Sequence, residues 1–548
     1  MNRLEFATSS HALLANLAAN GVDRVFLVPG ESYLGILDAL HDFPQLDVVT
    51  CRHEAGAGFM ALADARLSRR PGVVMVSRGP GASNVAIAIH TAQQDALPLI
   101  VLVGQVPWAS LRREAFQEID YQQMYGGIAK WVSEPRSPEQ VVEVIFKALR
   151  IASADTPGAV VIVLPEDIQQ QPVTGAALTL PQRATCVPSE ASLEQLTALL
   201  SRAERPLIIA GGALEAPGGR EALKDFAEAW NIPVVVSFRR HHLFPNRHAL
   251  YAGDLGLKNP QDQMDAFYRS DLILALGTRL GDITTQGYRF PALPRPAQTL
   301  VHCHPDGRCI GLNFAADLGL TCDAVALAAL MAARVAPGDG RASSAWAREL
   351  RGIYEKIARW PEQRAAGTAM PIDFTEVVRV LSEKAPDNSI ICLDAGAFGA
   401  PFYRHFPFDW ARRLLAPISG AMGYGVPAAV AAQLREPRAR VVCVVGDGGY
   451  MMTGNEMIAA VERSLPILFL LSNNAGYGSI RIHQDRTYPG RHAGTSLFNP
   501  DFTAIARAFG MEAERVESAA GIAPALSRGL QAEGPYFIEF RTVFGLAD

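Results

Sequence analysis

One stretch near the C-terminal end constrains the fold most, because it reads as strand, glycine turn, helix and strand in close succession. Val441–Val445 is a continuous apolar run, which is typical of a strand covered on both faces. Asn455–Ser464 has the spacing of an amphipathic helix, and Ile467–Leu471 is a second buried strand. Two strands joined by a helix predict a parallel β-sheet.

Polar groups follow both of these strands, at the edge where parallel sheets bind ligands. Asp447 follows the first strand, and Asn473 and Asn474 follow the second. A carboxylate, an amide oxygen and nearby carbonyls are hard ligands that suit Mg²⁺ holding a phosphate. An isolated glycine motif is often only a turn, but here three glycines allow the backbone to approach a ligand closely: Gly446, Gly448 and Gly449.

The rest of the chain alternates strand-like and helix-like segments in the same way. At 548 residues the chain is too long for one core, and we expect about three domains. We predict three α/β domains with doubly wound parallel sheets, at residues 1–170, 190–337 and 370–548. The polar, proline-punctuated segment 170–190 reads as a linker, and 337–341 as a second connector.

Composition excludes several classes of function. A formal charge of −5 provides no basic surface for nucleic acid. No apolar run approaches the roughly 20 residues of a membrane span, and the N-terminus lacks the regions of a signal peptide, so we expect a cytoplasmic protein. The seven cysteines are odd in number and scattered, which favours buried thiols over disulfides. His302, Cys303 and His304 alternate along a strand, so we do not favour a metal site there.

Two further segments have the composition of buried small-residue helices. Cys51–Arg66 places Glu54 between a strand and such a helix. A glutamate at a helix start is favoured by the helix dipole alone, so this position by itself does not indicate catalysis. Ser419–Ala429 is a glycine-rich segment that leads into another small-residue helix.

Taken together, these segments resemble the thiamine diphosphate superfamily of acetolactate synthase, pyruvate decarboxylase and benzoylformate decarboxylase, whose signature is GDG…NN. The resemblance implies Mg²⁺ ligands at Asp447, Asn474 and the main-chain oxygen of Gly476. It also implies that Glu54 is the catalytic glutamate, whose carboxyl group bonds to N1′ of the cofactor's pyrimidine so that the ring can take the thiazolium proton. In this family the catalytic glutamate and the diphosphate site come from different subunits, which implies a homodimer or homotetramer.

The resemblance also implies the remaining contacts to the cofactor. Gly420 would accept a hydrogen bond from the pyrimidine amino group, and Met422 would wedge between the two cofactor rings. The segment DAGAFG (Asp394–Gly399) resembles the family's loop that contacts the diphosphate. The implied cofactor-binding residues are Gly396, Ala397, Gly420, Met422, Gly446, Gly448, Gly449, Gly476 and Tyr477.

The substrate side matches the acetolactate synthase pattern only in part. REAFQEID resembles the synthase FQE segment, which implies that Phe116 and the catalytic residue Gln117 face the substrate. The segment SRGPGASN (Ser77–Asn84) has Arg78 at a position where acetolactate synthases usually have a small hydroxyl residue. VPGES (Val28–Ser32) also departs from the pattern, so Glu31 or Ser32 is expected to alter the substrate pocket. The segment after Gly478 provides Ile480 as a further expected pocket residue. Lys130 is either close to the pocket or a solvated surface charge.

LGTRLGD (Leu276–Asp282) resembles a segment that contacts FAD in flavin-carrying synthases, but His302 and His304 stand where acidic residues are common, and we do not favour bound FAD. The expected activity is decarboxylation of a 2-oxo acid followed by carboligation. The alternatives are simple decarboxylation, or lysis of a 2-hydroxy ketone (an acyloin) or a 2-hydroxyacyl-CoA. A catalytically silent regulatory paralogue is a further alternative.

Overall fold

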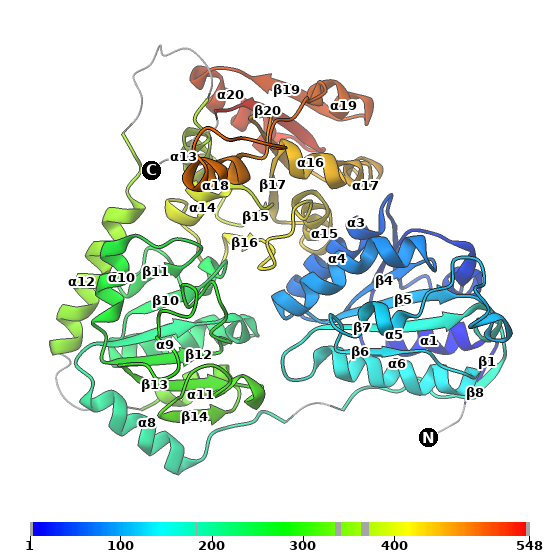
Figure 1. The fold of residues 1–548 in the computed structure, drawn as a ribbon, viewed down its shortest axis with the longest axis horizontal. Coiled ribbons are helices and arrows are strands. Elements are labelled where there is room, and N and C mark those ends of the chain that lie inside the picture. The colour runs from blue at the N-terminus through cyan, green and yellow to red at the C-terminus, as the bar shows by residue number, and fades with distance from the viewer. Residues whose placement is uncertain (1–3, 182–183, 335–340, 363–371, 544–548) are drawn as a thin grey trace.

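The computed structural model describes residues 4–181, 184–334, 341–362 and 372–543. It contains three six-stranded sheets in which every pair of neighbouring strands is parallel, and a short two-stranded antiparallel sheet. Each large sheet belongs to a separate α/β domain, and the three domains stand at the corners of a triangle (Figure 1). The predicted fold class is therefore confirmed.

The first sheet is covered by helices on both faces. Alternate residues of each strand enter different cores: Val74 packs with α3 (Glu54–Ser68) and α4 (Pro80–Asp95), whereas Val73 packs with α1 (Ser9–Ala19) and α6 (Pro138–Ser153). In spatial order the strands are β3 (Asp47–Thr50), β2 (Arg24–Leu27), β4 (Gly72–Val76), β5 (Leu99–Gln105), β7 (Ala159–Pro165) and β6 (Trp131–Ser133).

The second and third sheets are built in the same way. The central sheet runs β11 (Tyr251–Leu255), β10 (Val234–Ser237), β9 (Pro206–Ala210), β12 (Leu272–Leu276), β13 (Thr299–His304) and β14 (Leu318–Thr321). The third sheet runs β16 (Arg413–Leu415), β15 (Ser389–Leu393), β17 (Arg440–Gly446), β18 (Leu468–Asn473), β20 (Tyr536–Arg541) and β19 (Glu512–Val516).

The first and third domains share one continuous apolar core. Helix α3 packs along α15 (Gly425–Arg435), and the buried cluster that includes both helices extends to the strands of both sheets. Small residues also let α3 lie close to α4 within the first domain: a Cβ on Gly58 would lie 2.3 Å from the Cβ of Ala88 on α4. Ion pairs at the edge complete the contact, since Arg435 bonds Asp64 at 2.8 Å and Asp23 at 2.6 Å.

Two sequence-based interpretations need correction. Part of the segment interpreted as a linker forms β8 (Val173–Gly175), which pairs antiparallel with β1 (Leu4–Phe6). Lys130 is not a solvated surface charge: its ammonium group donates to the carbonyls of Ile151, Ala154 and Thr156 and so caps the C-terminal end of α6. The second expected connector falls mostly outside the described residues.

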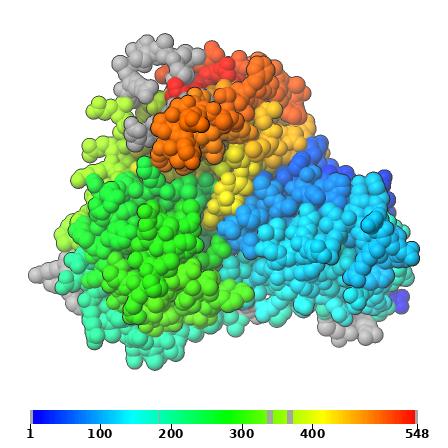
Figure 2. All heavy atoms as spheres, in the orientation of Figure 1, coloured from blue at the N-terminus to red at the C-terminus, as the bar shows by residue number. Residues whose placement is uncertain are grey.

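Among the described residues, no helix combines the length and the apolar content that crossing a bilayer requires. The space-filling view shows the three domains in contact with one another, with the segment before α15 between the first and central domains (Figure 2). That segment is fixed from both sides, because Arg66 donates to the carbonyl of Ala416 at 3.2 Å and Arg239 donates to the carbonyl of Pro417.

A buried ionic cluster joins the central domain to the first. Glu215, in η3 (Gly212–Glu215), accepts hydrogen bonds from Arg66 of α3 at 3.0 Å and from Arg240 at 3.1 Å. His242 lies 3.1 Å from the same oxygen, and burial lowers the pKa of its imidazole to about 3. Burial alone would raise the pKa of Glu215, but Arg240 and Arg66 hold it well below the usual range.

Replacing Glu215 with glutamine is expected to weaken this contact strongly, because the buried guanidinium groups of Arg66 and Arg240 would lose the carboxylate to which they bond directly. Loss of one partner from a buried ion pair typically costs about 3–5 kcal/mol of unfolding free energy. Urea unfolding followed by tryptophan fluorescence measures this effect. The matched control is Glu228→Gln, whose side chain is 44% exposed and pairs with Lys224, and whose expected cost is below about 1 kcal/mol. Equal effects for the two variants would contradict the role of Glu215.

Candidate active site

The GDGG segment begins a helix directly. Gly446 ends β17 and Asp447 is the first residue of α16 (Asp447–Thr453), without the tight turn expected from the sequence. The glycines are required by close packing instead: a Cβ on Gly448 would lie 2.5 Å from the ring of Tyr477, and one on Gly449 would lie 2.6 Å from a carboxylate oxygen of Asp394. The backbone of this segment therefore lies directly against Tyr477 and Asp394.

The predicted metal ligands lie together at the carboxyl ends of β17 and β18. The carboxylate of Asp447 accepts hydrogen bonds from the backbone N–H of Gly448 at 3.0 Å and from that of Gly476 at 3.1 Å. The amide oxygen of Asn474 also accepts from the Gly476 N–H, at 3.1 Å. A carboxylate, an amide oxygen and a backbone segment thus converge on one point. This donor set fits Mg²⁺ with a diphosphate.

Asn499 is a part of this site that the sequence did not reveal. Its amide donates to Asp447 at 2.7 Å and to the amide oxygen of Asn473 at 3.0 Å. Asn473 in turn donates to the buried carboxylate of Glu539 at 2.6 Å. These contacts orient Asp447 and leave Asn473 as a supporting residue. Burial raises the pKa of Asp447, which a bound cation would oppose.

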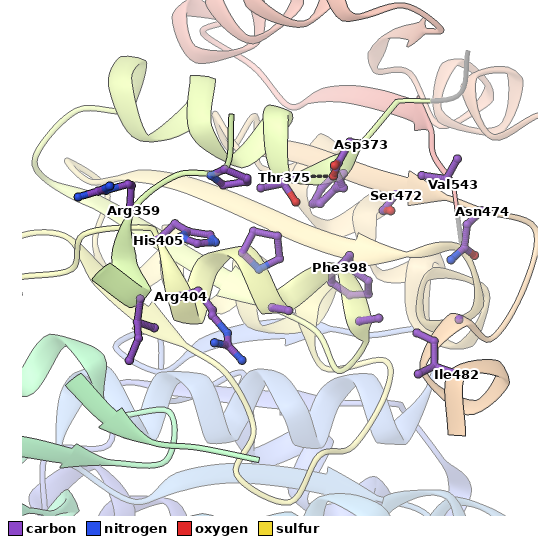
Figure 3. Close-up of a pocket in the computed structure, with 17 residues that line it drawn as sticks. Arg359, Asp373, Thr375, Phe398, Arg404, His405, Ser472, Asn474, Ile482 and Val543 are labelled. Carbon is purple, nitrogen blue, oxygen red and sulfur yellow. Dashed lines mark hydrogen bonds between the residues drawn. The ribbon is translucent and has the colours of Figure 1, made fainter. Parts of the chain in front are cut away.

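A cavity of about 280 Å³ opens beside these residues. Ser472, Asn474 and Phe398 face it from the carboxyl edge of the third sheet (Figure 3). Ala397, one of the expected diphosphate contacts, also lines it. Gly396 lies next to it in the chain, where a Cβ would be 2.3 Å from the ring of Phe398. The described residues that line the cavity all lie between 357 and 543, in and just before the third domain.

The segment expected to hold the pyrimidine ring is fixed by Asp394. Both carboxylate oxygens of Asp394 lie 3.0 Å from the backbone N–H of Gly423, directly after Met422. Burial raises the pKa of Asp394 to about 6. Gly420 has φ +72°, and nothing lies within 4 Å of a Cβ placed there. The turn before α15 therefore borders open space at Gly420.

Glu54 begins α3 and is half-buried at the junction of the first and third domains. Its carboxylate accepts a hydrogen bond from the side-chain amide of Asn84 at 2.9 Å. A Cβ on Gly81 would lie 3.1 Å from the same carboxylate, so the SRGPGASN turn packs directly against it. Glu54 is thus held by its own domain, and it is absent from the lining of the cavity beside Asn474.

The FQE segment also packs against the SRGPGASN turn, at Gly79. Gln117 has φ +64°, and its Cβ would be 2.9 Å from a Cβ on Gly79. Phe116 is 77% exposed and Ile480, on the third domain, is 51% exposed. The structure therefore brings Gln117 next to Gly79 and Glu54 next to Gly81 of one glycine turn. It leaves the two expected pocket residues Phe116 and Ile480 open to solvent in the single chain.

The two residues of the VPGES segment lie in different surroundings. Ser32 is buried, and its hydroxyl accepts from the backbone N–H of Arg78 at 3.0 Å and lies 3.1 Å from the hydroxyl of Ser77. Its hydroxyl therefore anchors the glycine turn. Glu31 is exposed at the start of η1 (Glu31–Tyr33).

A second cavity, of about 740 Å³, lies between the first and central domains and includes the LGTRLGD segment. The guanidinium groups in its lining already serve protein acceptors. Arg240 bonds Glu215, and Arg279 donates to the carbonyls of Gln93 and Gln94. A diphosphate bridge such as that of FAD would have to compete with these acceptors.

Comparison with known proteins identifies the family. Three family models match in order: the thiamine pyrophosphate enzyme N-terminal TPP binding domain at residues 7–124, the central domain at 193–331 and the C-terminal TPP binding domain at 394–540. A probable acetolactate synthase large subunit of Methanocaldococcus jannaschii is 30% identical over 97% of this chain and 91% of its own length. The isozyme 3 large subunit of Escherichia coli is 30% identical over 92% and 89%, and the large subunit of Corynebacterium glutamicum is 29% identical over 98% and 87%.

These matches cover nearly the whole chain and agree in order with its three sheets. The resemblance inferred from the GDG…NN motif is therefore confirmed, and the chain belongs to the thiamine diphosphate-dependent enzymes, among the relatives of the acetolactate synthase large subunits.

Proposed function

We propose that this enzyme decarboxylates a 2-oxo acid and joins the remaining carbon unit to a second carbonyl compound, as an acetolactate synthase does. One observation carries the proposal: similarity to acetolactate synthase large subunits extends over nearly the full length of the chain. The oxygen groups of Asp447 and Asn474 support it, because they converge beside a cavity at the carboxyl edge of the third sheet.

In this proposal each chemical task of the reaction has a residue in the chain. Asp447, Asn474 and the main-chain oxygen of Gly476 hold Mg²⁺, which anchors the diphosphate. When bound, thiamine diphosphate supplies a nucleophilic carbon and accepts the electron pair that departing CO₂ leaves behind. Glu54 holds a proton at N1′ of the pyrimidine, and Gln117 lies on the substrate side of the same turn. Gly420 and Met422 orient the pyrimidine ring.

The same proposal requires a homodimer or homotetramer. Within one chain, Glu54 is fixed by Asn84, and the cavity beside Asn474 is lined by described residues of a different domain. Phe116 and Ile480 are exposed apolar side chains that a second copy would cover. We therefore propose that Glu54 of one chain serves the cofactor held by Asp447 of another.

The proposal also keeps several expectations that were drawn from the sequence. The substrate is a small 2-oxo acid, no nucleic acid or membrane partner is expected, and the cytoplasm remains the expected location. FAD is left out of the proposed cofactors, because the arginines in the second cavity are already paired. We keep the proposed domain bounds 1–170, 190–337 and 370–548, since each encloses one of the three sheets.

Glu54→Gln is expected to reduce the turnover number by at least roughly 10³-fold while leaving the affinity for thiamine diphosphate within about threefold, because general acid–base catalysis contributes about 10²–10⁴-fold. Turnover is measured with saturating 2-oxo acid, and affinity by isothermal titration with Mg²⁺ present. Full activity in this variant would contradict the role given to Glu54.

Asp447→Asn is expected to weaken Mg²⁺-dependent binding of thiamine diphosphate by more than roughly 100-fold, because a charged metal ligand is lost. Asn499→Ala removes only the residue that orients Asp447 and should weaken binding by about 10–100-fold, as outer partners of metal ligands do. Asp387→Asn is the matched control, since Asp387 lies in the same domain, its side chain is 87% exposed and it pairs with Arg412. Binding unchanged by Asp447→Asn would place the metal elsewhere.

The reaction type can be tested with pyruvate, thiamine diphosphate and Mg²⁺. Carboligation predicts acetolactate as the main product, with one CO₂ released for every two pyruvate molecules consumed. Product analysis by NMR together with CO₂ release decides the outcome. Aldehyde formed without a coupled product would contradict carboligation and support a decarboxylase. If thiamine diphosphate bound tightly but no 2-oxo acid, acyloin or 2-hydroxyacyl-CoA turned over, a silent paralogue would be supported.

A further inference from the structure

Glu456 is a fully buried carboxylate with no task in the proposed reaction. It is the last residue of η7 (Gly454–Glu456), a short helix that directly follows α16. Helix α16 begins at Asp447. Its carboxylate crosses to the first domain and accepts hydrogen bonds from two consecutive backbone N–H groups. Arg52 donates at 3.0 Å and His53 at 2.9 Å to one oxygen, and Arg52 also lies 3.3 Å from the other.

These two N–H groups immediately precede Glu54. The chain leaves β3 at Thr50, passes through Arg52 and His53, and enters α3 at Glu54. His53 is the N-cap of this helix, and its side chain accepts from the backbone N–H of Ala55 at 3.1 Å. The carboxylate of Glu456 therefore fixes the backbone on one side of Glu54, while Asn84 holds the Glu54 side chain.

The fit between the two domains at this point is close. A Cβ on Gly56 would lie 2.7 Å from a carboxylate oxygen of Glu456, so α3 can lie against the carboxylate only because this position is glycine. The charged groups that face Glu456 are Arg52 and Glu54 of the first domain. A buried carboxylate is costly to desolvate unless hydrogen bonds compensate, as the N–H groups of Arg52 and His53 do here.

We propose that Glu456 is a positioning residue for Glu54: it holds the Arg52–His53 backbone so that the catalytic carboxyl group keeps one orientation toward the pyrimidine. The inference rests on the proposed role of Glu54. Glu456 follows the helical segment that begins at Asp447, the proposed metal ligand. Its hydrogen bonds therefore link that segment to Glu54, which in the proposed function serves the cofactor of a neighbouring chain. Burial raises the pKa of Glu456 to about 7, which agrees with a group used as a hydrogen-bond acceptor.

Two variants separate hydrogen bonding from charge. Glu456→Gln keeps one carbonyl oxygen, which can accept from both Arg52 and His53. Glu456→Met keeps the length and removes both acceptors. The control is Glu462→Met in α17 (Met457–Glu462), because Glu462 is 59% exposed and approaches only the Arg52 guanidinium, at 3.9 Å.

The first readout needs no cofactor. Amide hydrogen exchange of the peptide containing Cys51–Ala55 should be accelerated at least roughly tenfold in Glu456→Met, since two buried N–H groups lose their acceptor. It should stay near the wild-type rate in Glu456→Gln and Glu462→Met.

The second readout is deuterium exchange at C2 of bound thiamine diphosphate, followed by quenched-flow NMR. Glu456→Met should slow it by about 10²-fold, as a small displacement of a catalytic group does, with cofactor affinity within about threefold of wild type. Glu456→Gln should restore most of the rate.

Unchanged C2 exchange in Glu456→Met would overturn the proposal. So would an equal loss in both Glu456 variants, or a loss of C2 exchange matched by a loss of cofactor affinity, since these indicate a charge effect or a general structural role. If wild-type protein failed to accelerate C2 exchange, the proposed function would fail instead. The amide readout would still show whether Glu456 holds this segment.

Discussion

The packing of α3 against α15 is the contact on which the rest of the structure depends. Both helices are rich in glycine and alanine, so their backbones approach closely and one apolar core runs from the first sheet to the third. Helix α3 begins at Glu54, and α15 follows the segment that carries Met422. The contact between α3 and α15 therefore positions a candidate catalytic group and a candidate cofactor-binding turn. The ion pairs of Arg435 with Asp64 and Asp23 lie at its edge.

The central strands of each sheet were predictable because burial on both faces leaves a continuous apolar run, as in β17 and β18. Most of the outer strands were not, although β3, the outer strand that precedes Glu54, was predicted. β14 alternates buried and exposed residues over four positions, and β19 reads EAERV, with charged side chains on its exposed face. Such strands are defined by their hydrogen bonds to a neighbour, which a short sequence pattern does not encode. The pairing of β1 with β8 joins residues far apart in the chain and was missed for the same reason.

The residues of the candidate site were likewise predictable only in part. Asp447 and Asn474 were predictable because each follows a buried strand, and parallel strands present their carboxyl ends at one edge. Asn499 and Glu456 were not, because each acts on a residue distant in sequence: Asn499 on Asp447, and Glu456 on the peptide before Glu54. The glycines of GDGG were recognised, but the reason given for them was incomplete. Contact with Tyr477 and Asp394, rather than a turn, excludes side chains at Gly448 and Gly449.

The account rests on cofactor binding at the edge of the third sheet, completed by a carboxyl group from another chain. A crystal structure of the protein with thiamine diphosphate and Mg²⁺ tests this most directly. The account predicts diphosphate and metal density between Asp447 and Asn474, with Glu54 of a neighbouring chain within hydrogen-bonding distance of the pyrimidine. An empty site between Asp447 and Asn474, or a pyrimidine ring remote from every Glu54 in the assembly, would contradict it.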